Sequence, residues 1–287
     1  MKAIRVFLCR HPYLALFLPF IPLVGLAVLG VYYNLITPFS ALVALAWSFF
    51  LLSLPVRRMP RAVMREAVLA LERDLNPDEY LEKLDLLRTR PLKNPAARLS
   101  LGANYAAGLD AKGDSEAALA TLRALAAERG LLDPVNGVQF DLCYAVVAVH
   151  TEEGRGEVDA VLSSVNAALP TLPPALAAAV RETAEGVRKA LSLSTGGEND
   201  AALISYYVGT VTRYRKEGPM SRRRLMRSCM NLARAYDRAA RYPDAAAMYG
   251  YVIANGGSLG IVAEATAARA SLPTKAPAAP APEKEEN

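Results

Sequence analysis

Residues 12–56 read PYLALFLPFIPLVGLAVLGVYYNLITPFSALVALAWSFFLLSLPV and contain no Asp, Glu, Lys, Arg or His. The hydrocarbon core of a bilayer is about 30 Å thick and is crossed by about 20 helical residues. One helix of this whole stretch would be roughly 67 Å long, so we expect the stretch to fold back as two spans. The segment YYNLITP at 32–38 is the natural break, because it holds the only amide side chain of the stretch and a proline that can begin a second helix. We therefore predict a two-span transmembrane hairpin with spans at 13–32 and 38–56.

Basic residues flank this stretch on both sides, and none lies between the two spans. Because Lys and Arg gather on the cytoplasmic side of membrane proteins, we expect a multi-pass cell-membrane protein with both termini in the cytoplasm. A cleaved secretory signal is the alternative, but the apolar run is too long for one and no small-x-small cleavage site precedes a polar mature start. The flanking bases are Lys2, Arg5 and Arg10 before the stretch, and Arg57, Arg58, Arg61 and Arg65 after it.

These flanks also explain the net charge of +5 and the sequence pI of about 9.1. All 28 acidic residues follow residue 65, and without the flanking bases the chain is nearly neutral. The basic pI therefore gives no general argument for nucleic-acid binding. The cysteines, Cys9, Cys143 and Cys229, form no CxxC pair, which agrees with a reducing compartment and predicts neither a disulfide framework nor a zinc site.

The rest of the chain reads as helices. Asn-Pro and Asp-Pro pairs at 76–77, 94–95 and 133–134 supply a capping side chain followed by proline at the first helical position. No segment shows the period-2 alternation typical of strands, so we expect an all-α chain. Helices are predicted at 57–73, 77–90, 95–112, 115–129, 134–150, 157–169, 173–193, 200–216, 221–241, 243–254 and 258–272, with a turn at 153–156.

These elements divide the chain into five parts. Residues 1–11 form a basic cytoplasmic N-terminus, 12–56 the hairpin, and 57–75 a juxtamembrane helix, basic at first and then amphipathic through Val63, Ala67 and Leu71. Residues 76–272 form a helical domain. Residues 273–287, rich in Pro, Ala and Glu, cannot bury a core and are expected to be disordered.

Two units of this domain resemble the tetratricopeptide repeat, in which small residues let two antiparallel helices approach and aromatic residues fill the gap to the next pair. Residues 221–254 match most closely, and residues 94–130 match with a longer turn. The resemblance implies a solenoid of helix pairs that binds proteins; a generic α-helical bundle is the alternative. The residues that carry it are Leu232, Ala233, Tyr236, Ala245 and Tyr249 in the first unit, and Leu101, Gly102, Tyr105 and Ala118 in the second.

The sequence shows no catalytic motif. It contains no nucleophile elbow, P-loop, dinucleotide-binding fingerprint or zinc-protease motif, and we expect neither an enzyme nor a metal or cofactor site. His11 is interpreted as part of the basic flank. His150 is interpreted as a capping or surface histidine near a helix C-terminus.

One cluster of arginines stands out from a helical domain whose net charge is otherwise close to zero. At 100° per residue, five of them fall within about 60° on one face of the 221–241 helix. A solvated face of an amphipathic helix is one interpretation. The repeat resemblance implies another, in which Arg227, Arg234 and Arg238 face a concave groove that binds an acidic peptide. Contact with anionic lipid headgroups is a third, and RNA binding ranks last because aromatic residues are sparse. The five candidates are Arg223, Arg227, Arg234, Arg238 and Arg241.

The sequence therefore predicts a membrane-anchored helical-repeat protein that recruits or scaffolds a protein partner on the cytosolic side. The alternative is a structural or regulatory subunit of a membrane complex whose transmembrane hairpin is the main interface. The lipid bilayer is the first expected partner and an acidic protein segment the second.

Overall fold

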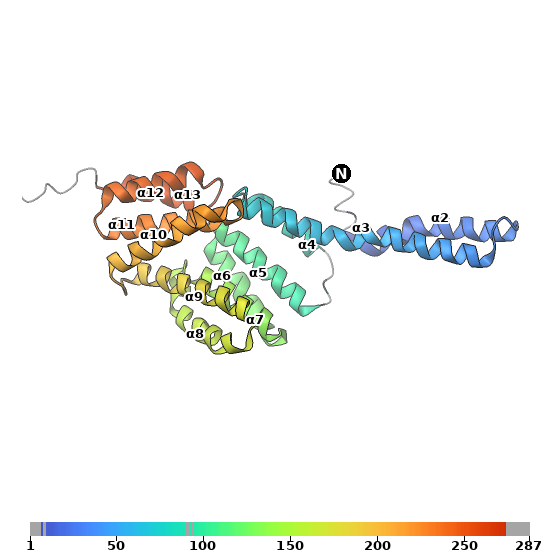
Figure 1. Cartoon of the computed structure of the whole chain (residues 1–287), viewed down its shortest axis with the longest axis horizontal. Coiled ribbons are helices and arrows are strands. Elements are labelled where there is room, and N and C mark those ends of the chain that lie inside the picture. Colours follow the sequence, from blue (N-terminus) through green and yellow to red (C-terminus); the bar gives the residue numbers. More distant parts are fainter. Residues whose placement is uncertain (1–6, 8–9, 90–91, 93, 274–287) are drawn as a thin grey trace, which may run out of the picture.

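The computed structural model describes residues 7, 10–89, 92 and 94–273. Within these residues every regular element is a helix and no strand occurs, which confirms the predicted all-α class. Figure 1 shows a long, narrow hairpin that projects from a helical body. The predicted bases Lys2 and Arg5 and nearly all of the predicted tail lie outside the described residues.

The hairpin consists of α2 (Pro12–Tyr32) and the first half of α3 (Pro38–Glu72). The break falls where the sequence predicts it, because the side chain of Thr37 accepts a hydrogen bond from the backbone N–H of Ser40 (3.2 Å) and Pro38 opens the helix. The rings of Phe20 and Phe49 meet edge to face across the hairpin, with centroids 5.4 Å apart. By length and composition, α2 and α3 are the two described helices that could cross a membrane.

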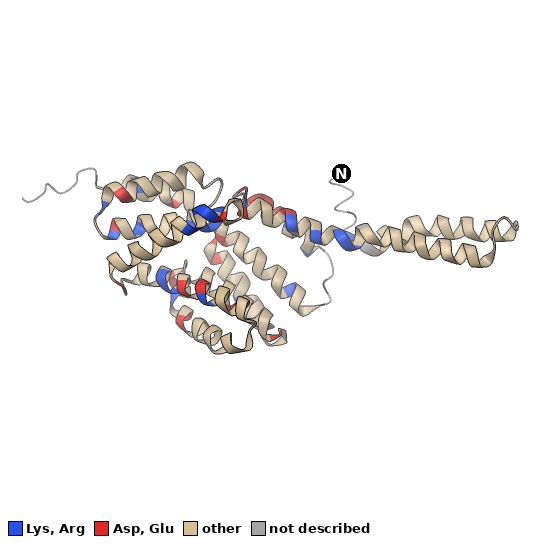
Figure 2. Ribbon diagram, viewed as in Figure 1, with Lys and Arg blue, Asp and Glu red and all other residues tan. Residues whose placement is uncertain are grey.

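Helix α3 is continuous from the hairpin into the body. The sequence predicts a span that ends at residue 56 and continues from the membrane as a basic, then amphipathic helix to residue 73, and α3 runs unbroken to Glu72. Its environment changes along its length: Trp47 is 61% exposed, whereas Val63 is 2% exposed in the core of the body. Figure 2 shows that charged side chains are absent from the described hairpin and begin on α3 where the body begins. The exposed apolar part of α3 and its buried part thus belong to one continuous helix.

Consecutive helices of the body pack as neighbours around two large apolar clusters. One cluster joins the end of α3 to α4 and to α10–α13, and the other joins α5–α9. The helices of the body are α4 (Pro77–Arg88), α5 (Pro95–Lys112), α6 (Ser115–Ala126), α7 (Pro134–Ala148), α8 (Glu152–Ala168), α9 (Pro174–Thr195), α10 (Asp200–Glu217), α11 (Arg222–Arg238), α12 (Tyr242–Asn255) and α13 (Ile261–Ser271), with short 3₁₀ turns at Arg129–Leu131, Leu169–Thr171 and Pro219–Ser221.

The C-terminal helices pack back on the beginning of the body. In the loop between α12 and α13, the backbone N–H of Ser258 donates to the carbonyl of Leu75 (3.1 Å), and the N–H of Gly260 donates to the carbonyl of Ala111 (2.9 Å). This loop therefore joins the far end of α3 to the C-terminal end of α5. In the part of the chain that the structure describes, the last helices of the body contact its first helices. The repeat solenoid stays a prediction.

Several predicted boundaries differ from the structure by three residues or more, and two of them show why. Residues 153–156 are not a turn but the first turn of α8, because the side chain of Thr151 caps the helix by accepting from the N–H of Gly154 (3.0 Å). Helix α11 ends at Arg238 rather than at residue 241, because Ala240 adopts a left-handed conformation (φ 56°) and Arg241 precedes α12. In the first place the helix begins earlier than the sequence pattern predicts, and in the second place the helix ends earlier.

The residues that carry the repeat resemblance lie between paired helices. In α5, a Cβ on Gly102 would clash with Leu125, which shows how closely α5 and α6 approach. At the α11–α12 contact, Ala233 and Ala245 are fully buried. Of the others, Leu101, Ala118, Leu232 and Tyr249 are buried, and Tyr105 and Tyr236 are half-buried, each beneath a guanidinium group, those of Arg88 and Arg241. These residues therefore lie at the contacts between paired helices, and the repeat resemblance itself stays a prediction.

Candidate functional site

Helix α11 carries four of the five candidate arginines, Arg241 precedes α12, and each of the five has a carboxylate partner within the chain. The partners come from five different helices or their ends, so the arginines point in different directions rather than forming one free face. Arg227 and Arg223 contact buried or half-buried acids, whereas Arg234 and Arg241 are more exposed. The pairs are Arg223–Glu72 (2.7 Å), Arg227–Asp110 (3.0 Å), Arg234–Glu264, Arg238–Asp200 and Arg241–Asp244 (2.6 Å).

Arg238 has the most extensive set of contacts. Besides Asp200, its guanidinium donates to the carbonyls of Ser192 (3.1 Å), Leu193 (3.1 Å) and Glu198 (2.6 Å). These carbonyls belong to the last turn of α9 and the loop that follows it, and that of Ser192 also accepts from the backbone N–H of Gly196 (3.0 Å). Arg238 therefore caps α9 and is occupied by this structural role. Binding of an acidic peptide by the five arginines stays a prediction, and it would require displacement of these partners.

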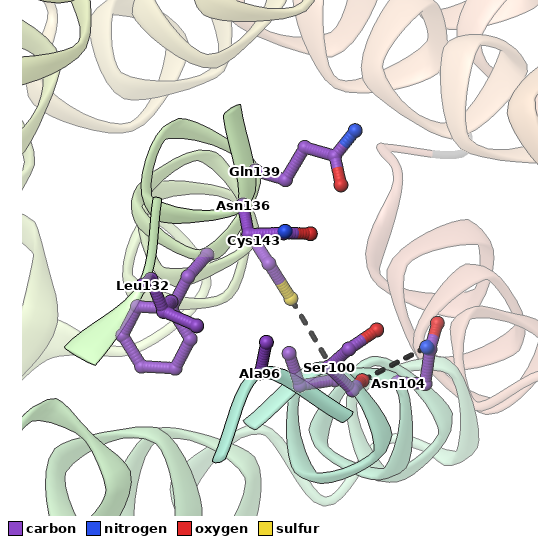
Figure 3. A pocket seen from close by; sticks show the side chains of 9 residues that line it. Ala96, Ser100, Asn104, Leu132, Asn136, Gln139 and Cys143 are labelled. Atoms are coloured by element: carbon purple, nitrogen blue, oxygen red, sulfur yellow. Dashed lines mark hydrogen bonds between the residues drawn. The ribbon is translucent and has the colours of Figure 1, made fainter. Parts of the chain in front are cut away.

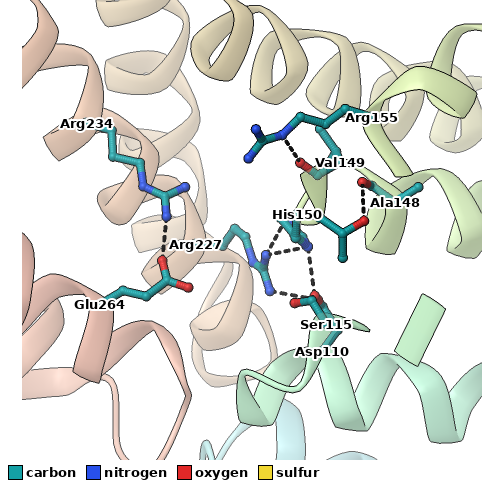
Figure 4. Close-up of polar contacts among 10 residues, drawn as sticks. Asp110, Ser115, Ala148, Val149, His150, Arg155, Arg227, Arg234 and Glu264 are labelled. Carbon is teal, nitrogen blue, oxygen red and sulfur yellow. Dashed lines mark hydrogen bonds and ion pairs between the residues drawn. The ribbon is translucent and has the colours of Figure 1, made fainter. Parts of the chain in front are cut away.

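A buried polar cluster lies beneath Arg227, at the junction of four elements. Asp110, on the last turn of α5, has a side chain only 3% exposed. Its carboxylate accepts from Ser115 Oγ (2.8 Å), from Arg227 Nη2 (3.0 Å) and from the imidazole Nδ1 of His150 (2.8 Å). Figure 4 shows these groups converging from α5, α6, α11 and the end of α7. The sequence interpretation of His150 as a surface or capping residue is therefore wrong: its side chain is 18% exposed and directed inward.

The contacts around His150 fix its tautomer. Nδ1 faces the Asp110 carboxylate and carries the proton, so the neutral Nε2 accepts from Arg227 Nη1. Burial lowers the pKa of His150 and the charge of Arg227 lowers it further, against the opposing effect of Asp110. Burial by itself would raise the pKa of Asp110, but His150, Arg227 and the hydrogen bond from Ser115 outweigh it and hold that pKa well below its usual range. The cluster at neutral pH is thus one carboxylate, one neutral imidazole and one guanidinium.

A small polar pocket of about 60 Å³ opens above this cluster. Arg155 and Arg234 reach toward the same space from opposite sides, as Figure 4 shows. Arg234 is paired with Glu264 at the rim, where the two side chains are 41% and 50% exposed. Among the described residues Arg155 has no carboxylate partner, and its Nε donates to the carbonyl of Val149 (3.3 Å). The lining also includes Ser194 on α9 and Asn231 on α11.

A second pocket, of about 130 Å³, lies between α5 and α7 (Figure 3). It is lined by uncharged side chains, among them Ser100, Asn104 and Gln139. Cys143 directs its thiol at the carbonyl of Ala103 (3.5 Å), and burial raises the pKa of this thiol to about 12. A thiol that stays protonated is a poor nucleophile, so this pocket offers space and hydrogen bonds but no reactive group.

The described residues contain no group of three or more His, Cys, Asp or Glu side chains arranged to hold a metal ion. Sequence reasoning identified Arg227 and Arg234 but missed Asp110, His150 and Arg155. A usable signal existed for Asp110, because it follows Ala106 and Leu109 on the otherwise apolar face of α5, where an acid requires an internal partner. Arg155 had no such signal, since the predicted turn at 153–156 hid its place on α8.

Comparison of the chain with protein-family models, with curated proteins and with solved structures gave no match in any of the three. The resemblance to the tetratricopeptide repeat therefore stays a prediction that rests on the helix-packing residues named above.

Proposed function

We propose that the protein is anchored in a membrane by its hairpin and holds a protein partner on the cytosolic side through its helical body. The observation that carries this proposal is the continuity of α3, whose first half exposes apolar side chains and whose second half lies in the core of the body. Apolar side chains exposed along both helices of a hairpin are stabilised in a bilayer rather than in water. The body, joined to the hairpin by one helix, is held at a fixed place above the surface.

The charges around α3 support a cytosolic body. Arg57, Arg58, Arg61 and Arg65 follow the apolar half directly, while the described turn between α2 and α3 has no charged residue (Figure 2). Cations are retained on the cytoplasmic side during membrane insertion. In this orientation both ends of the hairpin, and the whole body, face the cytosol.

A role in binding rather than catalysis agrees with the sites in the body. The polar cluster at Asp110 has its hydrogen bonds satisfied internally, and the thiol in the pocket between α5 and α7 is protonated. The body has two pockets at which a partner can bind, a charged pocket at one end of α5 and an uncharged pocket along α5 and α7.

The second candidate is a subunit whose hairpin is itself the interface. Large aromatic and aliphatic side chains along both helices of the hairpin, such as Phe17, Trp47 and Phe50, are exposed in the isolated chain. These side chains can contact lipid or the helices of another membrane protein.

Exchange of the hairpin separates the two candidates. Residues 12–56 of the full chain are replaced by an unrelated two-span hairpin of the same length with the same flanking arginines, and partners are crosslinked in native membranes and identified by mass spectrometry. Retention of the partners of the native chain supports binding by the body. Loss of all of them, with the exchanged protein still inserted, would establish the hairpin as the interface and overturn the first proposal.

A further inference from the structure

The pocket above Asp110 has more positive than negative charge at its lining. Arg155, Arg227 and Arg234 contribute three guanidinium groups, and Asp110 and Glu264 contribute two carboxylates. Asp110 lies beneath the pocket, 3% exposed, with its oxygens engaged by Ser115, His150 and Arg227. Arg227 therefore counters the negative charge of Asp110, and these two residues together add no net charge to the lining of the pocket. The cations that remain are Arg155, which has only a carbonyl partner among the described residues, and Arg234, whose partner is at the exposed rim.

We propose that this pocket binds a small phosphate, either inorganic phosphate or a phosphomonoester. Guanidinium groups form charge-assisted, often bidentate hydrogen bonds with phosphate oxygens, and they retain their charge at all physiological pH values. Here they are supplied by two helices, Arg155 by α8 and Arg234 by α11, while the Ser194 hydroxyl and the Asn231 amide line the same space.

The arrangement favours a tetrahedral oxyanion over a carboxylate. A carboxylate has two oxygens in one plane, and a single guanidinium satisfies both. Arg155 and Arg234 approach the pocket from opposite sides, so an anion with oxygens in several directions engages both of them at once (Figure 4). A volume of about 60 Å³ has room for a group of a few heavy atoms, the size of one phosphate, and not for a folded peptide segment.

The pocket lies away from the bilayer, which points to a soluble source of phosphate. On the proposed membrane orientation, α3 rises about 24 Å from Val56 to Glu72. The loop from Gly256 to Gly260 places the end of α5, where the pocket opens, next to Leu75 just beyond the end of α3. The pocket therefore lies near the end of α3 that is farther from the headgroups of the protein's own membrane, and this step of the argument rests on the proposed function.

Titration calorimetry of the purified full chain in detergent, at constant ionic strength, tests the proposal with inorganic phosphate as the probe. Native protein is expected to bind phosphate at one site, and Arg155→Gln to weaken that binding about tenfold, because a charge-assisted contact is lost. Arg188→Gln removes the same charge from an exposed position on α9 outside the pocket and is expected to leave the affinity unchanged. Equal affinities of Arg155→Gln and Arg188→Gln would overturn the proposal.

Glu264→Gln gives a second test, because a misfolded variant would bind phosphate more weakly, whereas the expected result is tighter binding. This substitution releases Arg234 from its rim partner and removes a negative charge from the lining, so phosphate is expected to bind several-fold more tightly. Unchanged or weaker binding by Glu264→Gln, in a variant with the native circular dichroism spectrum, contradicts the proposal.

Three further probes identify the chemistry and the source. Phosphoethanolamine is expected to bind like phosphate, and acetate much more weakly; equal binding of acetate would show that the pocket recognises a carboxylate. Binding that appears only when the protein is placed in bilayers of phosphatidic acid, and not with inorganic phosphate, would assign the site to lipid and overturn a soluble source. These outcomes leave the hairpin-exchange experiment unaffected, so failure of one proposal is distinguishable from failure of the other.

Discussion

Asp110 links parts of the chain that lie far apart in the sequence. It is joined to His150, 40 residues away, and to Arg227, 117 residues away. A buried carboxylate is costly unless its charge is countered and its oxygens accept hydrogen bonds, and here both conditions are met. The cluster stabilises the junction of α5, α7 and α11 because each partner of Asp110 comes from a different element.

Removal of this charge is expected to destabilise the protein strongly. Asp110→Asn leaves the guanidinium of Arg227 without its carboxylate and is expected to lower the free energy of unfolding by about 3 kcal/mol. Urea unfolding of the full chain in detergent, followed by circular dichroism, measures the change. Asp85→Asn is the matched control, because Asp85 and Arg88 form an exposed pair 3.6 Å apart and its loss is expected to cost under about 0.5 kcal/mol. Similar costs for the two variants would contradict the role given to Asp110.

His150 gives stability a pH dependence of predictable sign. Its pKa is lowered in the folded protein, so the unfolded chain takes up this proton first as the pH falls. The free energy of unfolding is therefore expected to decrease below pH about 6.5, by at most about 1.4 kcal/mol per pH unit, until the folded state is also protonated. Asp110, whose pKa is also lowered, adds to the loss only near pH 4 and below.

Denaturation at pH values between 7.5 and 5 measures this slope. His150→Gln is expected to lack it. The other histidine, His11, lies at the start of the hairpin, so His11→Gln is expected to keep the full slope. An unchanged slope in His150→Gln would show that another group controls the dependence.

At the scale of elements, the close approach of two backbones joins the C-terminal helices to α5. Gly113 ends α5 in a left-handed conformation (φ 103°), and Gly260 precedes α13 directly opposite. A Cβ on Gly260 would lie 2.5 Å from the Cα of Gly113 and 2.5 Å from the carbonyl oxygen of Lys112. Both contacts are to backbone, so the two helices would have to move apart to relieve them.

Gly260→Ala is therefore expected to lower the free energy of unfolding by about 1–3 kcal/mol, the usual cost of overpacking. Gly260 has φ −56°, so the effect is steric and not a matter of backbone strain. Gly209→Ala on α10 is the control: no atom lies within 4 Å of its Cβ position, and alanine in a helix interior is expected to stabilise by about 0.5–1 kcal/mol. Destabilisation by both variants to the same extent would contradict the close-approach argument.

At the scale of the whole molecule, the hairpin and the body differ in the polarity of their exposed surfaces. The hairpin exposes apolar side chains along its length, and the body covers its apolar clusters with charged and polar residues (Figures 1 and 2). Because α3 belongs to both, the proposed membrane anchoring ties the direction of the hairpin to the side of the membrane on which the body lies.

Cysteine labelling in sealed, right-side-out membrane vesicles tests this direction. In a Cys9→Ser background, Asn34→Cys in the turn of the hairpin is expected to react with a membrane-impermeant maleimide. Lys216→Cys, an exposed site at the end of α10, is expected to react only after permeabilisation. The native Cys143 and Cys229 give no signal, because burial raises the pKa of their thiols to about 12 and about 11. Labelling of Lys216→Cys in sealed vesicles would reverse the proposed topology.

Features that depend on neighbouring residues were predictable from the sequence. The break of the hairpin at residues 33–37 and the starts of α4, α5 and α7 were predicted, because a capping side chain followed by proline acts within one helical turn. The burial of Val63, Ala67 and Leu71 followed from helical periodicity alone. The sequence by itself thus determined the helical class, the apolar hairpin and most helix boundaries.

Only the tertiary structure decided what the charged residues do. Periodicity placed the five arginines on one face of the predicted 221–241 helix, but it could not show that Glu72, 151 residues before Arg223, or Asp110, 117 residues before Arg227, would meet them. Such pairs depend on how helices pack, and the free energy of that packing is summed over many contacts that no local pattern records. Arg155 was missed at both levels: the sequence interpretation placed a turn where Thr151 begins α8, and the meeting of Arg155 with Arg234 at one pocket depends on how α8 and α11 pack.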